Sequence, residues 1–522
     1  MDNENKEGNE ADFYVDDADL LEDDNEIKGE ENDLSNSLDG SELDFDEEDY
    51  MESESEGSKD NLKKVKKVTK EDLEKMFKRC LNGNNFFINK IINLFNKIGS
   101  NKVETMDEDH ILNIPKYSNK LIRYFVKELP TILIMKTNNV DLMEKKNIIN
   151  EVKLKNDSED HEDNFNENED DKENNKMEID DKINSQTLNT TKTTIKKYLS
   201  ALSKFIKNAE SNQRTFIFKN LSNCADLIIM FNNYTEIYLK YFLKAWAGDY
   251  GEQASEASLQ IVKTILSKNP NMFETALKLM YINYLEVAKE NSWKTLIMIK
   301  KLQEDIINIL SIDLQRAYMV IFMFIRKLCI QLRITINEKR SASIKNIYNW
   351  QFINSLKLWT FVLCKYFNEP FSDIKLLAYP LIQTIIGVIR LNLVDIFFPL
   401  RISLVNLLNK ISDETNIFIP CENYLFEVLE SSNFSKNFKR KILKSDNENR
   451  EFIDLNTSLK IKKEDSGNFG VITYLLEETI DSLLEFCGVN CYKISFPELG
   501  KAVNFYLRKI TKNMMVKNKL IN

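Results

Sequence analysis

Apolar side chains recur every three or four residues through most of the chain after about residue 186, a spacing that places them on one face of a helix. Residues 313–336 show the pattern most clearly, with intervals of 4, 3, 4 and 4 between successive apolar positions. The basic residues of this segment fall among the polar positions. The apolar positions are Ala317, Ile321, Phe324, Leu328 and Leu332, and the basic ones are Arg316, Lys327 and Arg333.

Comparable stretches predict further helices, with short breaks between them, at residues 346–368, 371–389, 398–412, 470–487 and 497–511. Strand patterns are nearly absent, and only residues 452–463 suggest an extended segment that lies across a neighbouring surface. Helix pairs recur about every forty to fifty residues, which is the period of degenerate two-helix repeats. The sequence therefore predicts an all-α fold, an irregular HEAT- or armadillo-like helical solenoid.

Acidic runs divide the rest of the chain. Residues 1–60 hold 26 acidic and 3 basic side chains, and residues 156–181 hold 13 acidic and 2 basic ones. Such segments bury too little apolar surface to offset the entropy of ordering. We therefore expect a disordered acidic tail at 1–60, an N-terminal helical segment at 61–155, an acidic flexible linker at 156–185, and a helical-repeat core at 186–515.

Outside the two acidic runs the chain is basic, with 66 lysines and arginines against 43 aspartates and glutamates. A basic body can bind polyanions while acidic tails repel or mimic them, or the tails can simply keep the protein soluble. Residues 62–70 form a basic cluster directly after the acidic tail, long enough to serve as a nuclear import signal. Its lysines include Lys63, Lys64, Lys66 and Lys67.

The residue inventory argues against an enzyme. The only histidines are His110 and His161, so the core has none for acid–base chemistry, and no glycine-rich loop ends in Gly-Lys-Ser/Thr. The seven cysteines are scattered singly, which fits a reducing compartment. The longest apolar run, residues 376–389, is shorter than the roughly twenty residues that span a bilayer. We expect no catalytic residue, cofactor, metal, small-molecule substrate or membrane partner.

Several short sequence words follow one another in the C-terminal two thirds. The first, IYNWQFINSLKLW at residues 347–359, holds two of the four tryptophans. The others are YPLIQ at 379–383, GVIRL at 387–391, FPLR at 398–401, FIP at 418–420, EVL at 427–429 and SFPEL at 495–499. In this order and spacing they resemble the nucleolar complex protein 2 family over roughly residues 196–512. Cys421 departs from the aliphatic residue usual in the family, and the N-terminal third shows no match.

The resemblance implies a non-enzymatic scaffold in ribosome biogenesis. It would pair with the first or third nucleolar complex protein on precursors of the large (60S) subunit, and support rRNA maturation and intranuclear transport. The implied partners are the pre-60S particle and its rRNA, and the implied location is the nucleus, in nucleolus and nucleoplasm. The alternative is a solenoid that resembles nuclear transport receptors and binds protein cargo.

Two groups of residues are candidates for fold-defining or partner contacts. The aromatic residues of the first word serve either as anchors where two helices cross or as surfaces on which RNA bases stack. A proline inside an apolar run should kink or divide its helix, and a glycine there would let another helix approach closely. The signature residues are Trp350, Phe352, Trp359, Pro380, Gly387, Arg390, Pro399 and Arg401. The basic residues Lys339, Arg340, Lys345, Lys439, Arg440 and Lys441 either contact rRNA phosphate or form a solvated face.

Overall fold

The computed structural model describes ten stretches of the chain, and all of them belong to the unit Lys66–Asn522. The described residues fold as helices joined by short turns, with no strand among them, so the predicted all-α class is confirmed. The stretches are residues 70–81, 84–99, 114–137, 170–249, 251–338, 340–370, 372–431, 454–462, 465 and 469–519.

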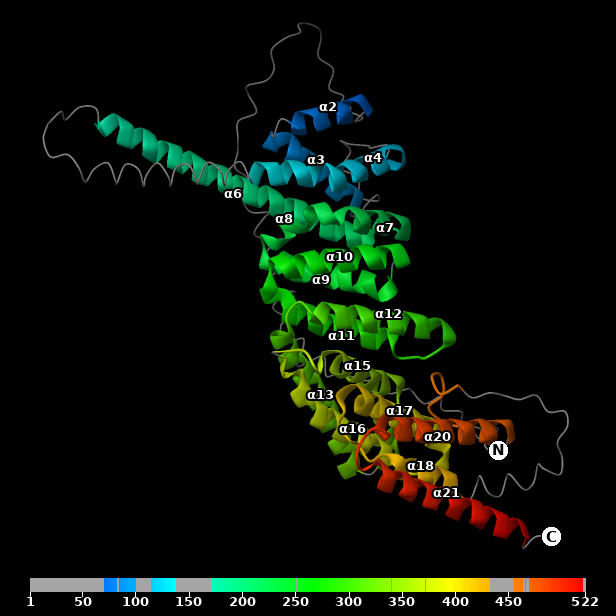
Figure 1. Ribbon diagram of the computed structural model, residues 1–522. Helices are drawn as coiled ribbons and strands as arrows, with labels where there is room; N and C mark the ends of the chain where they lie inside the picture. The colour runs from blue at the N-terminus through cyan, green and yellow to red at the C-terminus, as the bar shows by residue number, and fades with distance from the viewer. Residues whose placement is uncertain are drawn as a thin grey trace, which may run out of the picture. The chain divides into compact units, whose positions relative to one another are not determined.

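Helices that are neighbours in the chain are also neighbours in the fold, as expected for stacked helical repeats (Figure 1). The first group is α2 (Lys70–Leu81), α3 (Asn85–Gly99), α4 (Ile114–Lys127), α6 (Asp170–Asn208), α7 (Ser211–Asn220), η1 (Leu221–Cys224), α8 (Ala225–Ile229), α9 (Asn232–Lys244), the π-helical turn η2 (Ala245–Asp249) and α10 (Glu252–Lys268). The second is η3 (Pro270–Met272), α11 (Phe273–Val287), α12 (Trp293–Leu310), α13 (Leu314–Glu338), α14 (Ser341–Ile347), α15 (Trp350–Tyr366), η4 (Asp373–Leu377), α16 (Ala378–Leu391), η5 (Asp395–Phe397), α17 (Phe398–Thr415) and α18 (Glu422–Glu430). The last helices are α20 (Phe469–Asn490) and α21 (Phe496–Lys519).

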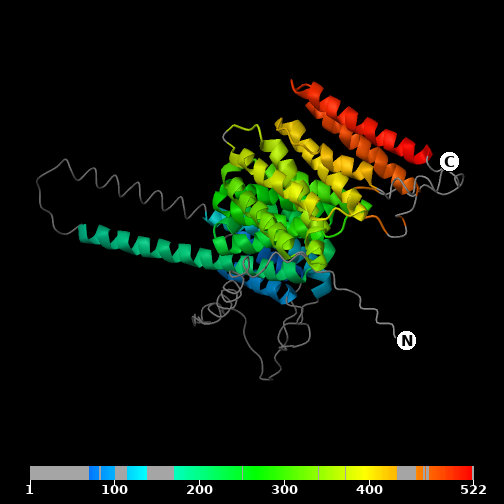
Figure 2. The same ribbon diagram turned by 90° about the horizontal axis from the view of Figure 1, so that it is seen from below.

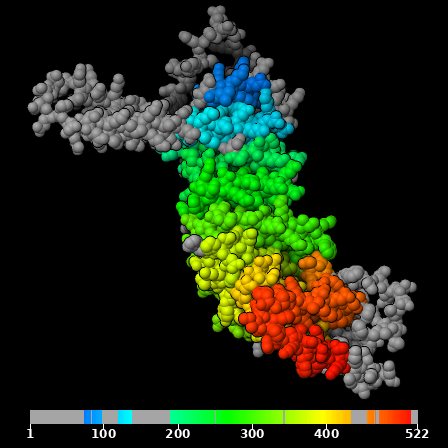
Figure 3. All heavy atoms as spheres, viewed as in Figure 1, coloured from blue at the N-terminus to red at the C-terminus, as the bar shows by residue number. Residues whose placement is uncertain are grey.

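Contacts between these helices run in sequence along the stack. Helix α10 packs on α7 and α9, α11 on α9, α12 and α13, and α13 on α16. Farther along, α15 packs on α17, and α17 and α18 pack on α20. Figure 2 shows α20, in orange, beside the yellow helices α17 and α18, and in Figure 3 the surface colours follow one another in chain order.

Helix α13 has the amphipathic pattern that its sequence predicts. All five apolar positions named for residues 313–336 are buried, with exposed fractions of 6% or less. The opposite face carries Arg326 and Arg333, which are exposed. Burial of this stripe against α11 and α16 is what holds the helix in the stack, because isolated helices gain little from propensity alone.

Pro380 and Gly387 shape the next helix in the way the sequence predicts. The segment divides at Ala378 into the 3-10 turn η4 and helix α16, with Pro380 in the first turn of α16, where a missing N–H costs no helical hydrogen bond. Gly387 faces α13, and a Cβ atom at this position would lie 2.7 Å from Cδ2 of Leu332. The absence of a side chain therefore permits the close approach of α13 and α16.

The stretch Asp373–Leu391 has the length and apolar composition of a membrane span. Half of its most apolar window is buried within the protein, however, and it packs on α13, α15 and α17. These contacts indicate a core helix.

Helix α6 crosses the predicted boundary between the acidic linker, residues 156–185, and the helical-repeat core, residues 186–515. Residues 156–169 of the predicted linker lie outside the described stretches, but residues 170–185 are helical and continue into the packed half of α6. Helix α3 packs against α6. The ring of Phe125 in α4 also lies 4.7 Å from the ring of Tyr198 in α6. A helix that is nucleated by packing can extend into polar sequence, because each added residue gains one backbone hydrogen bond. The segment predicted from its charge to be a flexible linker is therefore helical from Asp170 onward.

The segment predicted to lie across a neighbouring surface does so over residues 454–462. The Ile461 backbone N–H donates to the Ile396 carbonyl at 2.8 Å, and Ile461 is buried in a cluster with Phe398 and Val471. Leu455 packs on the same cluster. The segment forms turns and bends rather than an extended strand, and its Asn456 carbonyl accepts a hydrogen bond from Asn291, in the turn between α11 and α12.

Candidate binding site beside helix α15

Helix α15 carries apolar or small residues on nearly all of its faces and is surrounded by other helices. Its N-cap is Asn349, whose side-chain oxygen accepts the Phe352 backbone N–H at 2.8 Å. A helix that is buried on most faces must be surrounded by other elements. Contacts with α11, α12, α13, α14, α16 and α17 meet this requirement.

The aromatic residues of α15 divide into buried and exposed roles. Phe352 and Trp359 are 0% and 1% exposed, and the Trp359 ring lies 5.1 Å from Tyr281 of α11 and 6.0 Å from Phe324 of α13. These two side chains fix how the helices cross and are closed to RNA bases. Trp350 is partly exposed, and the Lys357 ammonium lies 5.5 Å from the centre of its ring.

Polar residues of α15 hold the carboxyl end of α11. Gln351 Nε2 donates to the Leu285 carbonyl at 3.1 Å, and Asn354 Nδ2 donates to the Ala288 carbonyl at 3.3 Å. Asn354 also donates to Asn291 Oδ1 at 2.8 Å, and Asn291 Nδ2 donates in turn to the Asn456 carbonyl at 3.0 Å. None of these residues was among the predicted site residues, although amides within an otherwise apolar helix signal buried hydrogen bonding.

Two arginines of the sequence words join α16 and α17 to α18. Arg401 is 4% exposed and its Nη1 donates to Glu427 Oε2 at 3.2 Å, which connects the FPLR word to the EVL word. Burial lowers the pKa of Arg401, and Glu427 opposes this effect. Arg390 Nε donates to the Tyr424 hydroxyl at 2.7 Å, and Pro399 lies in the first turn of α17. These residues stabilise helix contacts.

The basic residues proposed for rRNA contact are only partly described. Arg340, the N-cap of α14, and Lys345, in the last turn of α14, are exposed. The others lie outside the described residues, as do the lysines of the predicted import signal: Lys339, Lys439, Arg440, Lys441, Lys63, Lys64, Lys66 and Lys67. Contact of this set with rRNA therefore stays a prediction.

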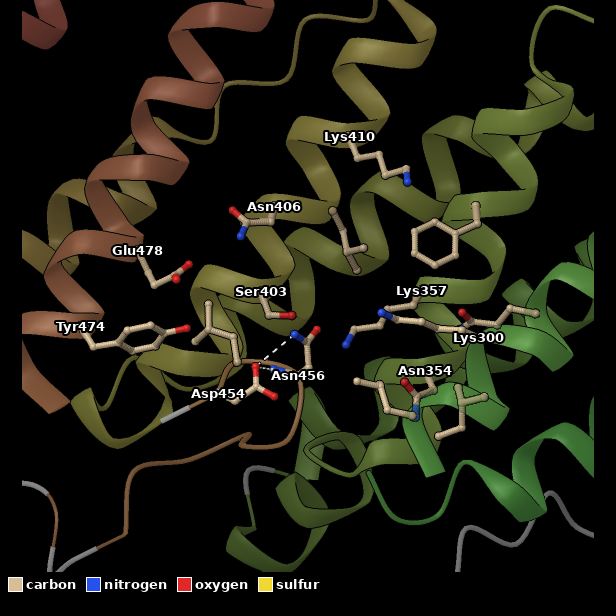
Figure 4. A pocket seen from close by; sticks show the side chains of 16 residues that line it. Lys300, Asn354, Lys357, Ser403, Asn406, Lys410, Asp454, Asn456, Tyr474 and Glu478 are labelled. Atoms are coloured by element: carbon tan, nitrogen blue, oxygen red, sulfur yellow. Dashed lines mark hydrogen bonds between the residues drawn. The ribbon is translucent and has the colours of Figure 1, made fainter. Parts of the chain in front are cut away.

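A pocket of about 390 Å³ lies where α12, α15, α17, α20 and residues 454–456 meet (Figure 4). Each helix contributes residues three or four positions apart, which lie on one helical face. Lys300 and Gln303 come from α12, and Asn354, Lys357 and Phe361 come from α15. The other polar lining residues are Ser403, Asn406 and Lys410 of α17, Tyr474 and Glu478 of α20, and Asp454 and Asn456.

Three lysines line one side of this pocket. Lys300, Lys357 and Lys410 make no ion pair with any described carboxylate. Burial lowers the pKa of Lys357 to about 8, an effect that Lys300 reinforces and Asp454 opposes. The Lys410 ammonium lies 4.5 Å from the centre of the Phe361 ring. This wall is a cluster of cations that form no ion pair within the part of the chain that the structure describes.

Carboxylates line the opposite side (Figure 4). Asp454 Oδ1 accepts hydrogen bonds from the backbone N–H and the side-chain amide of Asn456, both at 3.1 Å. Its Oδ2 is buried and has no hydrogen-bond partner among the described residues. Burial and the carboxylate of Glu478 raise the pKa of Tyr474. The pocket thus has a cationic wall, an anionic wall and the neutral side chains of Ser403 and Asn406 between them.

Fold and site together define an all-α repeat protein whose signature residues set the packing of neighbouring helices. Residues 271–521 match the family described as the Noc2p family. This match confirms the resemblance to that family found in the sequence.

Relatives with curated names support the same family. The chain is 28% identical over 320 residues to nucleolar complex protein 2 of Drosophila melanogaster, which covers 60% of this chain and 41% of the relative. It is 27% identical over 308 residues to nucleolar complex-associated protein 2 of Arabidopsis thaliana, with coverage of 58% and 39%. The nucleolar complex protein 2 homolog of Caenorhabditis elegans is 22% identical over 327 residues, with coverage of 62% and 45%. The chain spans less than half the length of each relative.

Proposed function

We propose that this protein is a non-enzymatic scaffold in ribosome biogenesis, located in the nucleus, in nucleolus and nucleoplasm. It pairs with the first or third nucleolar complex protein on precursors of the large (60S) subunit and supports rRNA maturation and intranuclear transport. The observation that carries the proposal is the family match over residues 271–521, together with relatives whose names place them in nucleolar complexes.

The packing of the helices supports a scaffold. The sequence words lie where helices contact one another: Trp359 against α11 and α13, Gly387 against α13, and Arg401 against Glu427 of α18. Stacked helices offer long faces for partners, and partner helices can lie in the grooves between them. Arg340 and Lys345 add exposed positive charge beside α15, which would hold rRNA phosphate by salt-sensitive contacts.

The test is affinity purification of the tagged full chain, with identification of co-purifying proteins and sedimentation through a sucrose gradient. We expect the chain to travel with large-subunit precursors and to bring other nucleolar complex proteins with it. Co-purification with small-subunit precursors alone would overturn the proposal. A chain confined to the light fractions with protein cargo would instead support the alternative related to transport receptors.

A further inference from the structure

The two-sided charge of the pocket calls for a ligand that carries a negative group at one end and hydrogen-bond donors at the other. Lys300, Lys357 and Lys410 reach the pocket from three different helices, so their convergence is a property of the fold. An anion placed among them would form the ion pairs that these lysines do not form with any described carboxylate. Phosphate fits this wall because lysine ammonium groups bind it as point charges.

An inorganic anion alone would leave the opposite wall unused. Asp454 Oδ2 is buried without a partner, and a buried acceptor without a donor costs free energy. A ligand that donates N–H groups there would remove this cost. Tyr474 and Glu478 lie on the same side and extend the wall along α20 (Figure 4).

A nucleotide has both ends. Its phosphate suits the lysines, and the N–H groups on its base edge suit carboxylates, as in other sites where single-stranded bases are bound through their Watson–Crick edges. Guanine offers a ring N–H next to an exocyclic amine, whereas uracil offers a single N–H between two carbonyl oxygens. The volume of about 390 Å³ lies within the range of about 300–1,000 Å³ typical of small-ligand sites.

We propose that this pocket binds one nucleotide, with its phosphate against Lys300, Lys357 and Lys410 and the N–H edge of a purine, preferably guanine, against Asp454 and Glu478. The nucleotide belongs to a single-stranded stretch of RNA. The choice of RNA over a free nucleotide rests on the proposed function. The fit of a nucleotide to the pocket rests on the lining residues alone.

The first experiment measures binding of the purified full chain to labelled single-stranded RNA by fluorescence anisotropy. The probes are two short oligomers that differ only in having guanine or uracil at the central position, with GMP, UMP and inorganic phosphate as competitors. We expect the guanine oligomer to bind roughly tenfold more tightly than the uracil oligomer. GMP should compete better than UMP or phosphate. Competition by phosphate as strong as that by GMP would overturn the nucleotide assignment, and GMP binding as tight as the oligomer would overturn the assignment to RNA.

Substitutions test the two walls separately. Lys357→Gln should weaken both oligomers alike and reduce the slope of log affinity against log salt by about 0.7, the loss of one phosphate contact. Asp454→Asn keeps the Oδ1 acceptor for Asn456 and should abolish the preference for guanine. Lys410→Gln, at an exposed position, repeats the first test if Lys357→Gln fails to fold.

The matched control is Lys365→Gln, which makes the same change on the same helix at an exposed position that does not line the pocket. It should leave both affinities and the salt slope unchanged. Equal losses in Lys365→Gln and in the pocket lysine variants would overturn the inference. A wild-type chain that sediments with large-subunit precursors but binds neither oligomer would overturn this inference and leave the proposed function standing.

Discussion

The pocket lysine on α15 shows how a single side chain can serve binding at the expense of stability. Lys357 lies partly buried beside Lys300, and its ammonium loses hydration without gaining an ion pair to a described carboxylate. Buried charges without partners are costly, so they persist mainly where a ligand supplies the missing charge. The cost of burying this ammonium can be measured as a change in stability, without any ligand.

Replacing Lys357 with methionine should stabilise the protein at neutral pH. The pKa of Lys357 is about 8 in the folded chain and about 10.4 when unfolded, so the unfolded state binds more protons between these values. Wild-type stability should therefore rise with pH through this window. We expect Lys357→Met to raise the free energy of unfolding at pH 7 by about 1–2 kcal/mol, with the gain lost towards pH 10. Urea unfolding at a series of pH values measures this, with Lys365→Met as the control; parallel pH profiles for wild type and Lys357→Met would contradict it.

In the Arg401–Glu427 pair a half-exposed carboxylate stabilises a buried guanidinium charge. Glu427→Gln leaves the Arg401 guanidinium buried without its counter-charge and should cost about 1–2 kcal/mol, less than in a fully buried pair because the Glu427 side chain is 48% exposed. Arg401→Met in the same background removes that charge and should restore part of the loss. A double-mutant cycle in urea gives the coupling energy, and a value near zero would show that the pair contributes nothing.

At the scale of helices, local sequence determines much of what is observed. The stripe on α13, the division of the segment at Ala378 and the close approach at Gly387 all follow from periodicity, proline chemistry and the lack of a side chain. The pocket does not, because Lys300, Lys357 and Lys410 have the appearance of ordinary surface lysines in the sequence. Only the tertiary packing of α12, α15, α17 and α20 brings them together, over separations that no local pattern reports.

Gly387→Ala tests the approach of α16 to α13. Alanine in a helix interior gains about 0.5–1 kcal/mol over glycine, but here the new methyl group would lie 2.7 Å from Cδ2 of Leu332, which is 6% exposed. Overpacking of this kind costs about 1–3 kcal/mol, so the net effect should be destabilising. Gly488→Ala on α20, with no atom within 4 Å of the added Cβ, should show the gain alone.

The control for this comparison is the double variant Gly387→Ala with Leu332→Val, which shortens the side chain that meets the methyl group. We expect it to be more stable than the sum of the two single changes predicts. Equal stability of the Gly387→Ala and Gly488→Ala variants by thermal unfolding would show that α13 and α16 are not in close contact.

At the scale of the whole molecule, net charge conceals the character of the folded core. The full chain carries a formal charge of −11, whereas removal of residues 1–60, with 26 acidic and 3 basic side chains, leaves a chain of +12. Composition predicts this division, while the extent of α6 depends on packing that composition does not report. The acidic tail and the import signal remain predictions, since both lie outside the described residues.

Deletion of residues 1–60 should strengthen non-specific RNA binding without unfolding the helices. At about 50 mM salt we expect random-sequence RNA to bind roughly tenfold more tightly, because the repelling charge is gone, with the difference shrinking as salt screens it. Circular dichroism and thermal unfolding should match those of the full chain. A large fall in melting temperature would mean that the tail contributes to folding, and a salt-independent difference would exclude an electrostatic cause.

The two hydrogen bonds made by the side-chain amide of Asn291 have a mechanical consequence. Its Oδ1 accepts from Asn354 in α15, and its Nδ2 donates to the Asn456 carbonyl. One side chain therefore connects the turn after α11, helix α15 and the segment that holds Asp454. A displacement of this segment is therefore transmitted to the contact between α11 and α15. By reciprocity, a more rigid contact between these two helices restrains the segment. A ligand bound in the pocket would therefore make the stack of helices more rigid where α11 and α15 meet.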